Sequence, residues 1–456
     1  MAKVQSIYVC QQCGYQSSSW LGKCPQCQTW GSLVETVVDQ NLKKESVLAG
    51  AELKLEKLAE VQSFEAKRLT TGFEEFDRVL GGGPPNARAG IVPGSVVLLA
   101  GDPGIGKSTL LLQVAKNLAA SYPKKSVLYI SGEESTAQLK LRADRILTLG
   151  KSAKIPNNLF ALSQNNVEDI SRLFNQQDFS LVVVDSIQTM VSDELSGQAG
   201  SVGQVRFAVQ TLHQVAKALN IPLFLVGHVT KEGAVAGPRV VEHLVDVVLY
   251  LEGEEFSTLR VLRSIKNRFG SVSEVGIFEM TSDGLSQVSN PSKLFLAQRR
   301  KDTAGSVVVP TLQGRRPILA EIQALTTPTS FGLPRRVATG VDYNRLLMII
   351  AVLSKRAKFP LSQSDIYVNV AGGLKVFEPA CDLGIALSIV SAIKFQSLPP
   401  NLVALGEIGL LGEVREVVET KRRIEEAKKL GFRLFLTKTE AKTLEEAIRI
   451  ALKAPN

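Results

Sequence analysis

A glycine-rich segment between a strand-like run and a helix-like run constrains this chain more than any other feature. The apolar run 96–100 (VVLLA) precedes the segment, and the helical stretch 110–119 follows it. The segment itself reads Gly101, Asp102, Pro103, Gly104, Ile105, Gly106, Lys107, Ser108 and Thr109. A strand, a glycine loop and a helix in this order are typical of a P-loop, whose backbone amides converge on phosphates. The segment therefore predicts an NTP-binding site rather than a simple glycine turn.

The loop lysine and the serine after it have distinct predicted roles. Lys107 can reach the β and γ oxygens of a nucleotide, and Ser108 is placed to hold Mg²⁺ where the helix begins. A second apolar run, 181–184 (LVVV), ends in Asp185. A buried parallel strand that ends in this way presents a Walker B carboxylate to the metal ion. We therefore expect ATP or dATP, together with Mg²⁺, as the cofactors of this site.

Two glutamates follow a third strand-like run. Residues 127–130 (VLYI) lead through Ser131 and Gly132 into Glu133 and Glu134. Open α/β sheets build their sites at the carboxyl ends of the strands, so these carboxylates can lie beside the nucleotide. We predict that Glu133 is the general base that activates water, with Glu134 as the alternative. Both glutamates could instead be favourable acids in the first turn of a helix.

Four cysteines near the amino terminus form two pairs with metal-ligand spacing. Two residues separate Cys10 from Cys13, and two separate Cys24 from Cys27. Four thiolates on two tight turns can close a tetrahedron around Zn²⁺, and so short a segment has little apolar surface with which to fold otherwise. We predict a structural zinc ribbon. Two disulfides are the alternative, which the absence of an apparent signal peptide and an intracellular character disfavour.

The two tryptophans of the chain, Trp20 and Trp30, flank these cysteine turns. An indole ring has a large apolar surface, so we expect both rings to pack over the small core of the ribbon. Stacking on nucleic-acid bases or on a partner protein is the alternative use.

Positive charge is concentrated in the carboxyl-terminal part of the chain. The formal net charge is +9, and residues 286–456 carry 25 Lys and Arg against 15 Asp and Glu. A polyanion is the natural partner, and nucleic acid is favoured over a membrane because no basic amphipathic helix with a bulky aromatic face is evident. An excess of this size can also serve solubility alone. No apolar stretch is long enough to span a bilayer, so we expect a cytoplasmic, nucleoid-associated protein.

The order of these motifs divides the chain into four parts. Strand-like runs alternate with helical stretches around the P-loop, which favours an α/β fold with a doubly wound, mostly parallel sheet. The predicted parts are a zinc ribbon over 1–34, a linker over 35–64, a P-loop ATPase domain over 65–287 and a further domain over 288–456.

Two stretches of the ATPase part are rich in Gly, Ser and Ala. Residues 191–204 and 231–239 both follow strand-like runs that end in nucleotide-side residues. We expect them to be mobile loops that can follow a polymer substrate. His228 precedes the second stretch, and it either senses the γ-phosphate or has a structural role only.

The order of motifs resembles that of the RadA (Sms) family of bacterial recombination and repair ATPases. The shared motifs are the zinc ribbon, RLTTGFEEFDRVLGGG, GDPGIGKST, SGEES, VVVDSIQT and KNRFG at 266–270. The resemblance covers nearly the whole chain, and KNRFG is its most specific element. It implies a RecA-like core in a hexameric ring that binds single-stranded DNA, hydrolyses ATP between subunits and drives branch migration of recombination intermediates. It also implies a RecA-type recombinase as a partner.

The same resemblance gives the two cations of KNRFG a role. In such rings, as in the similar DnaB-type helicases, Lys266 and Arg268 would reach the ATP of a neighbouring subunit as catalytic fingers or would contact DNA. Positive groups supplied across an interface stabilise charge on the transferring phosphoryl group. Without the family, both residues would be interpreted as surface charges at a strand end.

The carboxyl-terminal region resembles the Lon protease domain, which implies an α+β fold. Lon-type proteases use a serine nucleophile with a downstream lysine as base. Here Asp382 stands at the serine position, Lys421 matches the lysine, and Cys381 is the remaining candidate nucleophile. We therefore expect an inactive protease domain that acts as a scaffold. The basic groups that it could present to DNA are Arg299, Arg300, Lys301, Arg315, Arg316, Arg335, Arg336, Lys421, Arg422 and Arg423.

Two functions follow from these observations. The first is a DNA-dependent, helicase-like ATPase motor in DNA recombination and repair. The alternative is a RecA-like signalling or assembly ATPase whose hydrolysis times the binding of a protein partner. An ATP-gated peptidase is disfavoured because Asp382 cannot replace the serine nucleophile.

Overall fold

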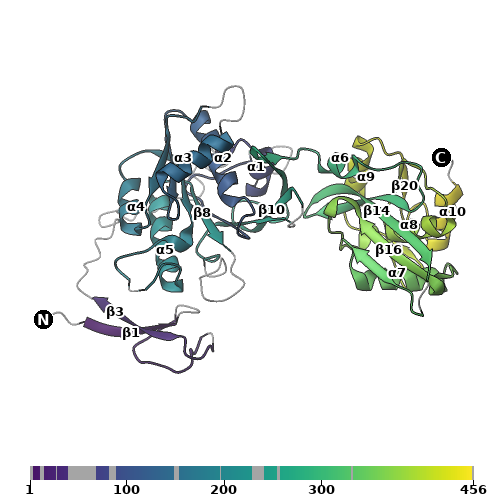
Figure 1. Cartoon of the computed structure of the whole chain (residues 1–456), viewed down its shortest axis with the longest axis horizontal. Coiled ribbons are helices and arrows are strands. Elements are labelled where there is room, and N and C mark those ends of the chain that lie inside the picture. The colour runs from purple at the N-terminus through teal and green to yellow at the C-terminus, as the bar shows by residue number, and fades with distance from the viewer. Residues whose placement is uncertain are drawn as a thin grey trace, which may run out of the picture. The chain divides into compact units, whose positions relative to one another are not determined.

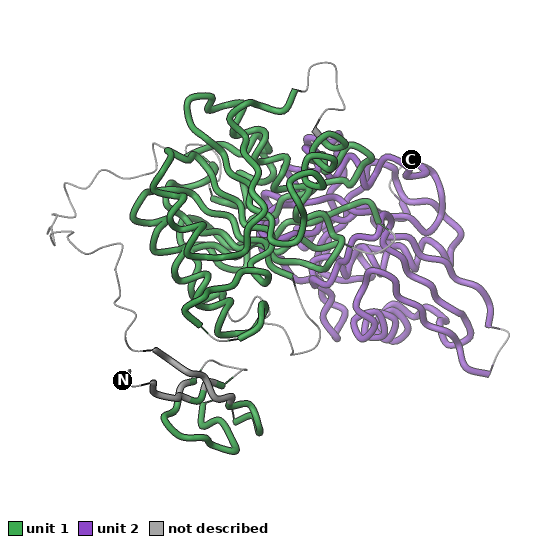
Figure 2. Tube along the Cα trace, turned by 60° about the vertical axis from the view of Figure 1, so that its left-hand side comes forward, with its two compact units in different colours: residues 1–288 green, residues 289–456 purple. Residues whose placement is uncertain are grey.

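The chain consists of two compact units, Met1–Val288 and Ser289–Asn456, which Figure 2 shows in different colours. The second unit begins one residue after the start predicted for the carboxyl-terminal domain. None of the described helices combines the length and apolar character that crossing a membrane requires. The computed structural model describes residues 4–10, 15–26, 28–39, 68–81, 89–147, 154–195, 197–228, 241–253, 257–329 and 332–453.

The amino-terminal module is a three-stranded antiparallel sheet. Its strand order is β2-β1-β3, with β1 at Val4–Cys10, β2 at Gln16–Ser17 and β3 at Leu33–Asp39. Strands β1 and β3 pair along their whole length. The predicted end of the ribbon at Val34 was therefore too early, because pairing with β1 keeps the chain in the sheet as far as Asp39. The rest of the predicted linker, 40–64, lies outside the described residues.

The tryptophans of this module lie outside its core. Cys10, Cys24 and Leu33 form the buried cluster, and three partly buried side chains pack against it. Trp20 is 60% exposed and Trp30 is 75% exposed. The expectation that both rings pack over the core was wrong, because smaller side chains fill it: Tyr8, Tyr15 and Leu21 pack against the cluster.

A nine-stranded sheet forms the centre of the ATPase part. Its order is β12-β11-β10-β9-β4-β8-β7-β5-β6, in which β9 to β6 are parallel and β10, β11 and β12 extend one edge in antiparallel fashion. The predicted doubly wound, mostly parallel sheet is confirmed. The strands are β4 (Val96–Gly101), β5 (Ser126–Ser131), β6 (Leu159–Ser163), β7 (Phe179–Asp185), β8 (Leu223–His228), β9 (Val247–Glu252), β10 (Leu259–Asn267), β11 (Val275–Thr281) and β12 (Gly284–Gln287).

Helices cover both faces of this sheet (Figure 1). Side chains alternate along a strand, so β4 sends Val97 and Leu99 into one core and Val96 and Leu98 into the other. The first core contains helices α1 (Glu74–Leu80), α2 (Lys107–Ser121) and α3 (Thr136–Leu147). The second contains α4 (Val167–Phe174) and α5 (Val202–Ala218). Burial on both faces explains why the strands read as continuous apolar runs.

The first stretch predicted as a mobile loop is packed at both ends. Helix α5 begins at Val202, and the buried Gln204 accepts a 2.7 Å hydrogen bond from Ser192 N. The Gln204 amide donates to Leu195 O at 2.7 Å. Gln204 thus ties the two ends of the predicted loop 191–204 together, and the last three residues of the stretch belong to α5. The second stretch, 231–239, lies outside the described residues.

The second unit contains a mixed six-stranded sheet with helices, as the α+β expectation required. The sheet order is β15-β16-β14-β13-β17-β20, β18 and β19 form a separate hairpin, and α8 packs on β13 and β14. The strands are β13 (Ser306–Gln313), β14 (Arg316–Pro328), β15 (Arg336–Thr339), β16 (Ser364–Val370), β17 (Leu402–Ala404), β18 (Glu407–Ile408), β19 (Val414–Arg415) and β20 (Leu434–Leu436). The helices are α6 (Pro291–Leu296), α7 (Tyr343–Lys355), α8 (Asp382–Lys394), α9 (Thr420–Lys429) and α10 (Leu444–Lys453).

Two basic residues that were expected to face DNA are structural. Arg423 is 1% exposed and makes a two-point ion pair with Glu378, at 2.6 and 2.7 Å. Arg299 donates to Pro400 O at 2.7 Å, and its guanidinium lies over the Phe432 ring. Burial removes both from any DNA surface. Of the ten basic residues predicted to face DNA, Arg316 and Arg336 are partly buried, and six are exposed: Arg300, Lys301, Arg315, Arg335, Lys421 and Arg422.

Candidate active site

The P-loop joins the buried strand β4 to helix α2, and its glycines adopt positive φ angles that other residues rarely adopt. Gly101 has φ +153°, and a Cβ there would lie 2.4 Å from Leu251 O. Gly106 has φ +111°, and a Cβ there would lie 2.6 Å from Met280 Cε. Gly106 is also the N-cap of α2 and offers no side-chain cap. The first amides of α2 are therefore left to bind an anion.

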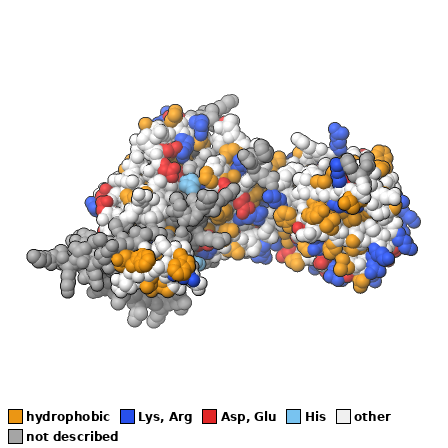
Figure 3. Space-filling view, turned by 60° about the horizontal axis from the view of Figure 1, so that its bottom comes forward, with side chains coloured by type: hydrophobic (Ala, Val, Ile, Leu, Met, Phe, Trp, Pro, Cys, Tyr) orange, Lys and Arg blue, Asp and Glu red, His pale blue; other side chains and the backbone are white. Residues whose placement is uncertain are grey.

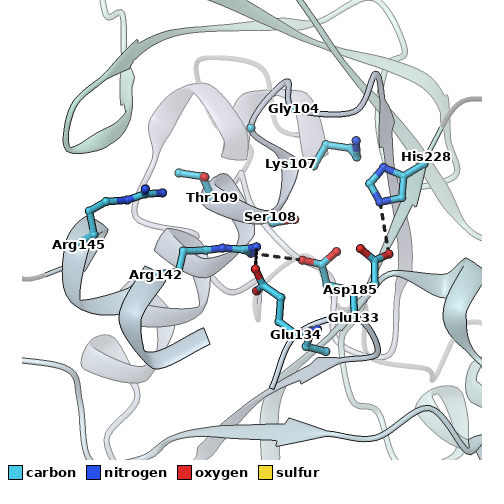
Figure 4. Close-up of a pocket in the computed structure, with 12 residues that line it drawn as sticks. Gly104, Lys107, Ser108, Thr109, Glu133, Glu134, Arg142, Arg145, Asp185 and His228 are labelled. Atoms are coloured by element: carbon cyan, nitrogen blue, oxygen red, sulfur yellow. Dashed lines mark hydrogen bonds and ion pairs between the residues drawn. The ribbon is translucent and has the colours of Figure 1, made fainter. Parts of the chain in front are cut away.

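A cavity of about 330 Å³ lies beside this loop, at the carboxyl edge of the parallel strands (Figure 4). The loop, the ends of β5, β7 and β8, and helix α3 supply its walls. Of the nine predicted loop residues, five line it: Gly104, Gly106, Lys107, Ser108 and Thr109. The other four do not line it. Gly101 and Ile105 are buried beneath the loop, and Asp102 and Pro103 are exposed.

Lys107 is held within the loop. Its Nζ donates to Gly101 O and to Asp102 O, each at 2.9 Å, and the residue is only 3% exposed. Burial lowers the pKa of Lys107 to about 8, although Asp185, Asp102 and Glu133 act in the opposite direction. Because both partners are carbonyls of the loop, the ammonium group can move to a bound phosphate without leaving a carboxylate unpaired.

Asp185 ends β7 inside the cavity, as predicted for the Walker B carboxylate. The Tyr129 hydroxyl donates to Asp185 Oδ2 at 2.6 Å, and Arg142 Nη1 lies 3.9 Å from the same oxygen. Ser108 lines the same cavity. A hydroxyl and a carboxylate are oxygen ligands of the kind that Mg²⁺ prefers, so the donor set fits a magnesium nucleotide.

The two glutamates after β5 have different surroundings. Glu133 Oε1 accepts a 2.7 Å hydrogen bond from Ser186 Oγ, and its side chain is 52% exposed, which leaves it open to water. Glu134 is paired with the guanidinium of Arg142, and its amide donates to Ser131 Oγ at 2.9 Å. An ion pair holds the second carboxylate in place. The geometry thus favours Glu133 over Glu134 as the general base.

His228 ends β8 next to Glu133. Its Nε2 lies 3.8 Å from Glu133 Oε1, and its Nδ1 is buried without a hydrogen-bond partner among the described residues. Burial lowers the pKa of His228, and the nearby Lys107 acts in the same direction. The imidazole is therefore mainly neutral near pH 7. Its place at the cavity wall keeps the γ-phosphate sensor a workable prediction.

The KNRFG segment lies away from this cavity. Lys266 Nζ donates to Glu242 O and Val245 O, each at 2.8 Å. Arg268 Nη1 lies 3.2 Å from Oδ1 of the buried Asp246. Asn267, which lies between the two cations in the sequence, donates to the last two carbonyls of α1. Gly270, at the end of the motif, packs so closely that a Cβ there would lie 2.7 Å from Gly81 Cα. The uncharged members of the motif thus anchor it, Lys266 is half-buried and Arg268 is exposed.

Position 382, which the resemblance to Lon proteases aligns with their catalytic serine, carries no nucleophile. Asp382 is fully buried, and Arg345 donates to both of its oxygens, at 2.6 and 2.5 Å. Cys381 is also fully buried, and burial raises the pKa of its thiol well above the usual range. Lys421 lies exposed on α9. An ion-paired aspartate and a protonated thiol support the expected absence of peptidase chemistry.

The described half of the predicted zinc set fits one ion. Cys10 and Cys24 belong to a single buried cluster, and each ends a turn closed by its own amide, on Tyr15 O at 2.8 Å and on Thr29 O at 3.0 Å. Cys13 and Cys27 lie outside the described residues. Two buried thiols on two such turns supply two of the four ligands that a tetrahedral zinc ribbon requires.

Sequence reasoning missed the arginines of the cavity. Arg142 and Arg145 line it from α3, where residues three apart share one face of the helix. Arg142 is positioned to hold Glu134 and to neutralise Asp185. The available signal was the location of α3, which begins directly after the glutamates and so must run along the cavity.

Known proteins and protein families resemble both the ATPase part and the cysteine-rich module of this chain. A family model described as "AAA domain" matches residues 65–234, and one described as "Rubredoxin metal binding domain" matches residues 8–35. "DNA repair protein RadA" of Halalkalibacterium halodurans is 50% identical over 436 residues, which cover 95% of this chain and 92% of that protein. The protein of the same name from Bacillus subtilis is 48% identical, with the same coverage. The crystal structure of the RadB recombinase is similar to 48% of this chain and 100% of its own, at 23% identity and a TM-score of 0.36, which is too low to support an argument.

Substituting Glu133 and Glu134 in turn should show which of them is the general base. We expect Glu133→Gln to lower the kcat of ATP hydrolysis by about 10²- to 10⁴-fold, the range that a positioned general base contributes. Glu134→Gln, the matched control, should lose much less because Glu134 acts through Arg142. Steady-state turnover, with nucleotide affinity measured separately, provides the comparison. A larger loss in Glu134→Gln than in Glu133→Gln would contradict the assignment.

The lowered pKa of Lys107 gives a pH dependence of nucleotide binding. Below a pH of about 8 the ammonium is charged and can bind phosphate, and above this pH it loses its proton. The dissociation constant of MgADP should therefore be flat from neutral pH to about 8 and should then rise, by at most about tenfold per pH unit. Calorimetry from pH 7 to above pH 9 measures it, with Lys107→Arg as the control that does not titrate. A flat profile in the wild-type protein would count against this role of Lys107.

Proposed function

Because this chain belongs to the family of DNA repair proteins named RadA, we propose that it is an ATP-hydrolysing motor that acts on single-stranded DNA in recombination and repair. In this proposal the subunits form a hexameric ring, and hydrolysis drives branch migration of recombination intermediates. The P-loop cavity binds ATP, and the basic side chains that remain exposed in the second unit contact the DNA backbone.

The observation that carries the proposal is the separation of the KNRFG cations from the cavity of their own subunit. Val247 pairs with both Val97 of β4 and Asn267 of β10, so the end of β10 lies level with the start of β4. The P-loop follows the other end of β4, at Gly101. At about 3.3 Å per residue, the two edges lie roughly 13 Å apart. Lys266 and Arg268 can therefore act on ATP only if that ATP belongs to a neighbouring subunit.

A buried carboxylate holds one of these cations in place. Asp246 is 1% exposed, and its Oδ1 lies 3.2 Å from both Arg268 and Lys217. Its Oδ2 accepts a hydrogen bond from Val96 N at 3.1 Å, and Val96 is the first residue of β4. Asp246 is therefore a positioning residue, because it ties the finger arginine to the strand that carries the P-loop.

The roles of the cavity residues follow from their surroundings. Lys107 moves from its loop carbonyls to the β- and γ-phosphates, where it neutralises charge. Glu133, held by Ser186, accepts a proton from the attacking water. Ser108 and Asp185 would hold Mg²⁺, which neutralises charge on the phosphates when bound. Lys266 and Arg268 of the neighbour stabilise the charge that develops during transfer.

The zinc ribbon has a structural role in this proposal. Cys10, Cys13, Cys24 and Cys27 would hold Zn²⁺, which supplies the folding free energy that so small a core lacks. The thiolates fill all four positions of the metal, so no open position is left for catalysis.

Stimulation by DNA tests the proposed function directly. ATP turnover by the purified full-length chain should rise several-fold with single-stranded DNA, and the rise should fall as salt increases because phosphate contacts release counterions. Lys107→Ala should show no turnover and serves as the blank. Turnover that ignores DNA at every salt concentration would contradict the motor and would favour the signalling or assembly ATPase.

Mixing two inactive variants tests action across the interface. Lys107→Ala spoils the cavity and Lys266→Ala spoils the finger, so each alone should lose most of its turnover. If fingers act between subunits, an equal mixture that exchanges subunits should recover activity at about one interface in four, where an intact finger meets an intact cavity. Mixing Lys107→Ala with Lys107→Ala,Lys266→Ala is the matched control and should recover nothing. No recovery in the first mixture would mean that Lys266 does not act in trans.

A further inference from the structure

The exposed tryptophans of the amino-terminal module form a defined pair. A Cβ on Gly22 would lie 3.6 Å from Trp20 Cη2 and 3.7 Å from Trp30 Cζ3, so both rings lie next to this glycine. Both rings are mainly exposed, at 60% and 75%. Figure 3 shows hydrophobic side chains open to solvent on the described part of this module. We call Trp20, Gly22, Lys23 and Trp30 the tryptophan pair site.

The backbone holds this site in place. Lys23 and Trp30 form an antiparallel bridge, and Gly31 N donates to Gly22 O at 2.8 Å. At the tip of the same hairpin, Cys24 N donates to Thr29 O at 3.0 Å. The backbone that carries Gly22, Lys23 and Trp30 is thus held at the base of a cysteine turn. A preformed aromatic pair binds a ligand at little cost in conformational entropy.

The glycine beside the rings is not required by its backbone. Gly22 does not have a positive φ, and its nearest Cβ contacts would be ordinary van der Waals distances. A larger side chain is therefore sterically possible at position 22, but it would lie against both indoles. Glycine at this position leaves the adjoining ring surfaces uncovered, so that a flat ligand can stack on them.

The charge around the site favours a polyanion. Residues 15–34 contain one charged side chain, Lys23, and no carboxylate. Lys23 Nζ lies 5.7 Å from the centroid of the Trp30 ring, so the cation and the aromatic face adjoin. Aromatic faces next to a lysine, without acidic groups, are the features that single-stranded nucleic-acid sites use: bases stack and the lysine meets phosphate.

We propose that the tryptophan pair site binds unpaired bases of single-stranded DNA by stacking on Trp20 and Trp30, with Lys23 contacting an adjacent phosphate. Bases inside a duplex already stack on their neighbours, so the site selects single strands. The proposal takes its partner class from the proposed function, but it adds a DNA contact in the amino-terminal module. A second DNA grip would keep the strand bound while the ATP cavity empties.

The two tryptophans are the only ones in the chain, which makes the site visible in the intact protein. Titrating the zinc-loaded, full-length protein with oligo-dT should quench tryptophan fluorescence, and a duplex of the same length should quench it far less. Unchanged fluorescence at oligonucleotide concentrations that saturate binding, measured by anisotropy of a labelled oligonucleotide, would overturn the proposal. A change produced only by a recombinase protein, and not by DNA, would also overturn it.

Substitutions test the stacking itself. Trp20→Ala and Trp30→Ala should each weaken oligo-dT binding by about tenfold, the scale of one lost base–aromatic stack. Trp20→Phe and Trp30→Phe keep a ring and should retain most of the affinity. Gly22→Val keeps both indoles but places methyl groups against them, so it should weaken binding as the alanine variants do. Zinc content and DNA-free ATP turnover should stay at wild-type values in all five, because none touches the ATP cavity.

The outcomes separate this site from the proposed function. Wild-type affinity in zinc-loaded Trp20→Ala, Trp30→Ala and Gly22→Val would overturn the stacking proposal even if DNA still stimulated ATP turnover. Conversely, quenching by oligo-dT with turnover indifferent to DNA would support the tryptophan pair site and contradict the motor. If an alanine variant lost its zinc, the phenylalanine and Gly22→Val variants and the wild-type quenching would still decide the question.

Discussion

A buried parallel strand can bring functional groups into contact with solvent or ligand only at its two ends. Strand β4 is such a strand, and its two ends decide where the functional groups of the ATPase part lie. Hydrogen bonds to β8 and β9 occupy its two sides, and helices cover both of its faces. Its carboxyl end opens as the P-loop, and its first amide, Val96 N, donates to Asp246. The nucleotide cavity and the KNRFG motif therefore lie at opposite edges of one sheet and share a single rigid element.

Much of the cavity could be predicted because its signals are local in the sequence. Apolar runs mark buried strands, and glycine spacing marks a loop that approaches phosphate. Once the runs before Lys107, Glu133 and Asp185 are read as parallel strands, their carboxyl ends must meet at one edge. The structure brings these three side chains to the same cavity. Not every residue of the predicted loop lines the cavity. Ile105, for example, packs into the core beneath the loop.

Residues whose role depends on distant partners could not be predicted in this way. Arg422 and Arg423 are neighbours in one basic run, yet Arg422 is exposed and Arg423 is buried against Glu378, which lies far away in the sequence. Charge composition alone does not tell such residues apart. Helical phase offers a partial signal, since Arg423 and Ala427 are four residues apart on the buried face of α9. Trp20 shows the opposite error. Its size favoured burial, but other side chains fill the small core and Trp20 is exposed.

The surroundings of Asp246 make it easy for Arg268 to change partners. Removing the only cation from a buried carboxylate typically costs about 3–5 kcal/mol, because the charge is left unpaired. Here Lys217 lies at the same 3.2 Å distance from Asp246 Oδ1 and remains when Arg268 leaves. Arg268 is also 54% exposed, so water already offsets part of its ion pair. In the proposed ring, Arg268 would alternate between its own subunit and a neighbour's phosphate, and Lys217 would keep Asp246 paired while it does.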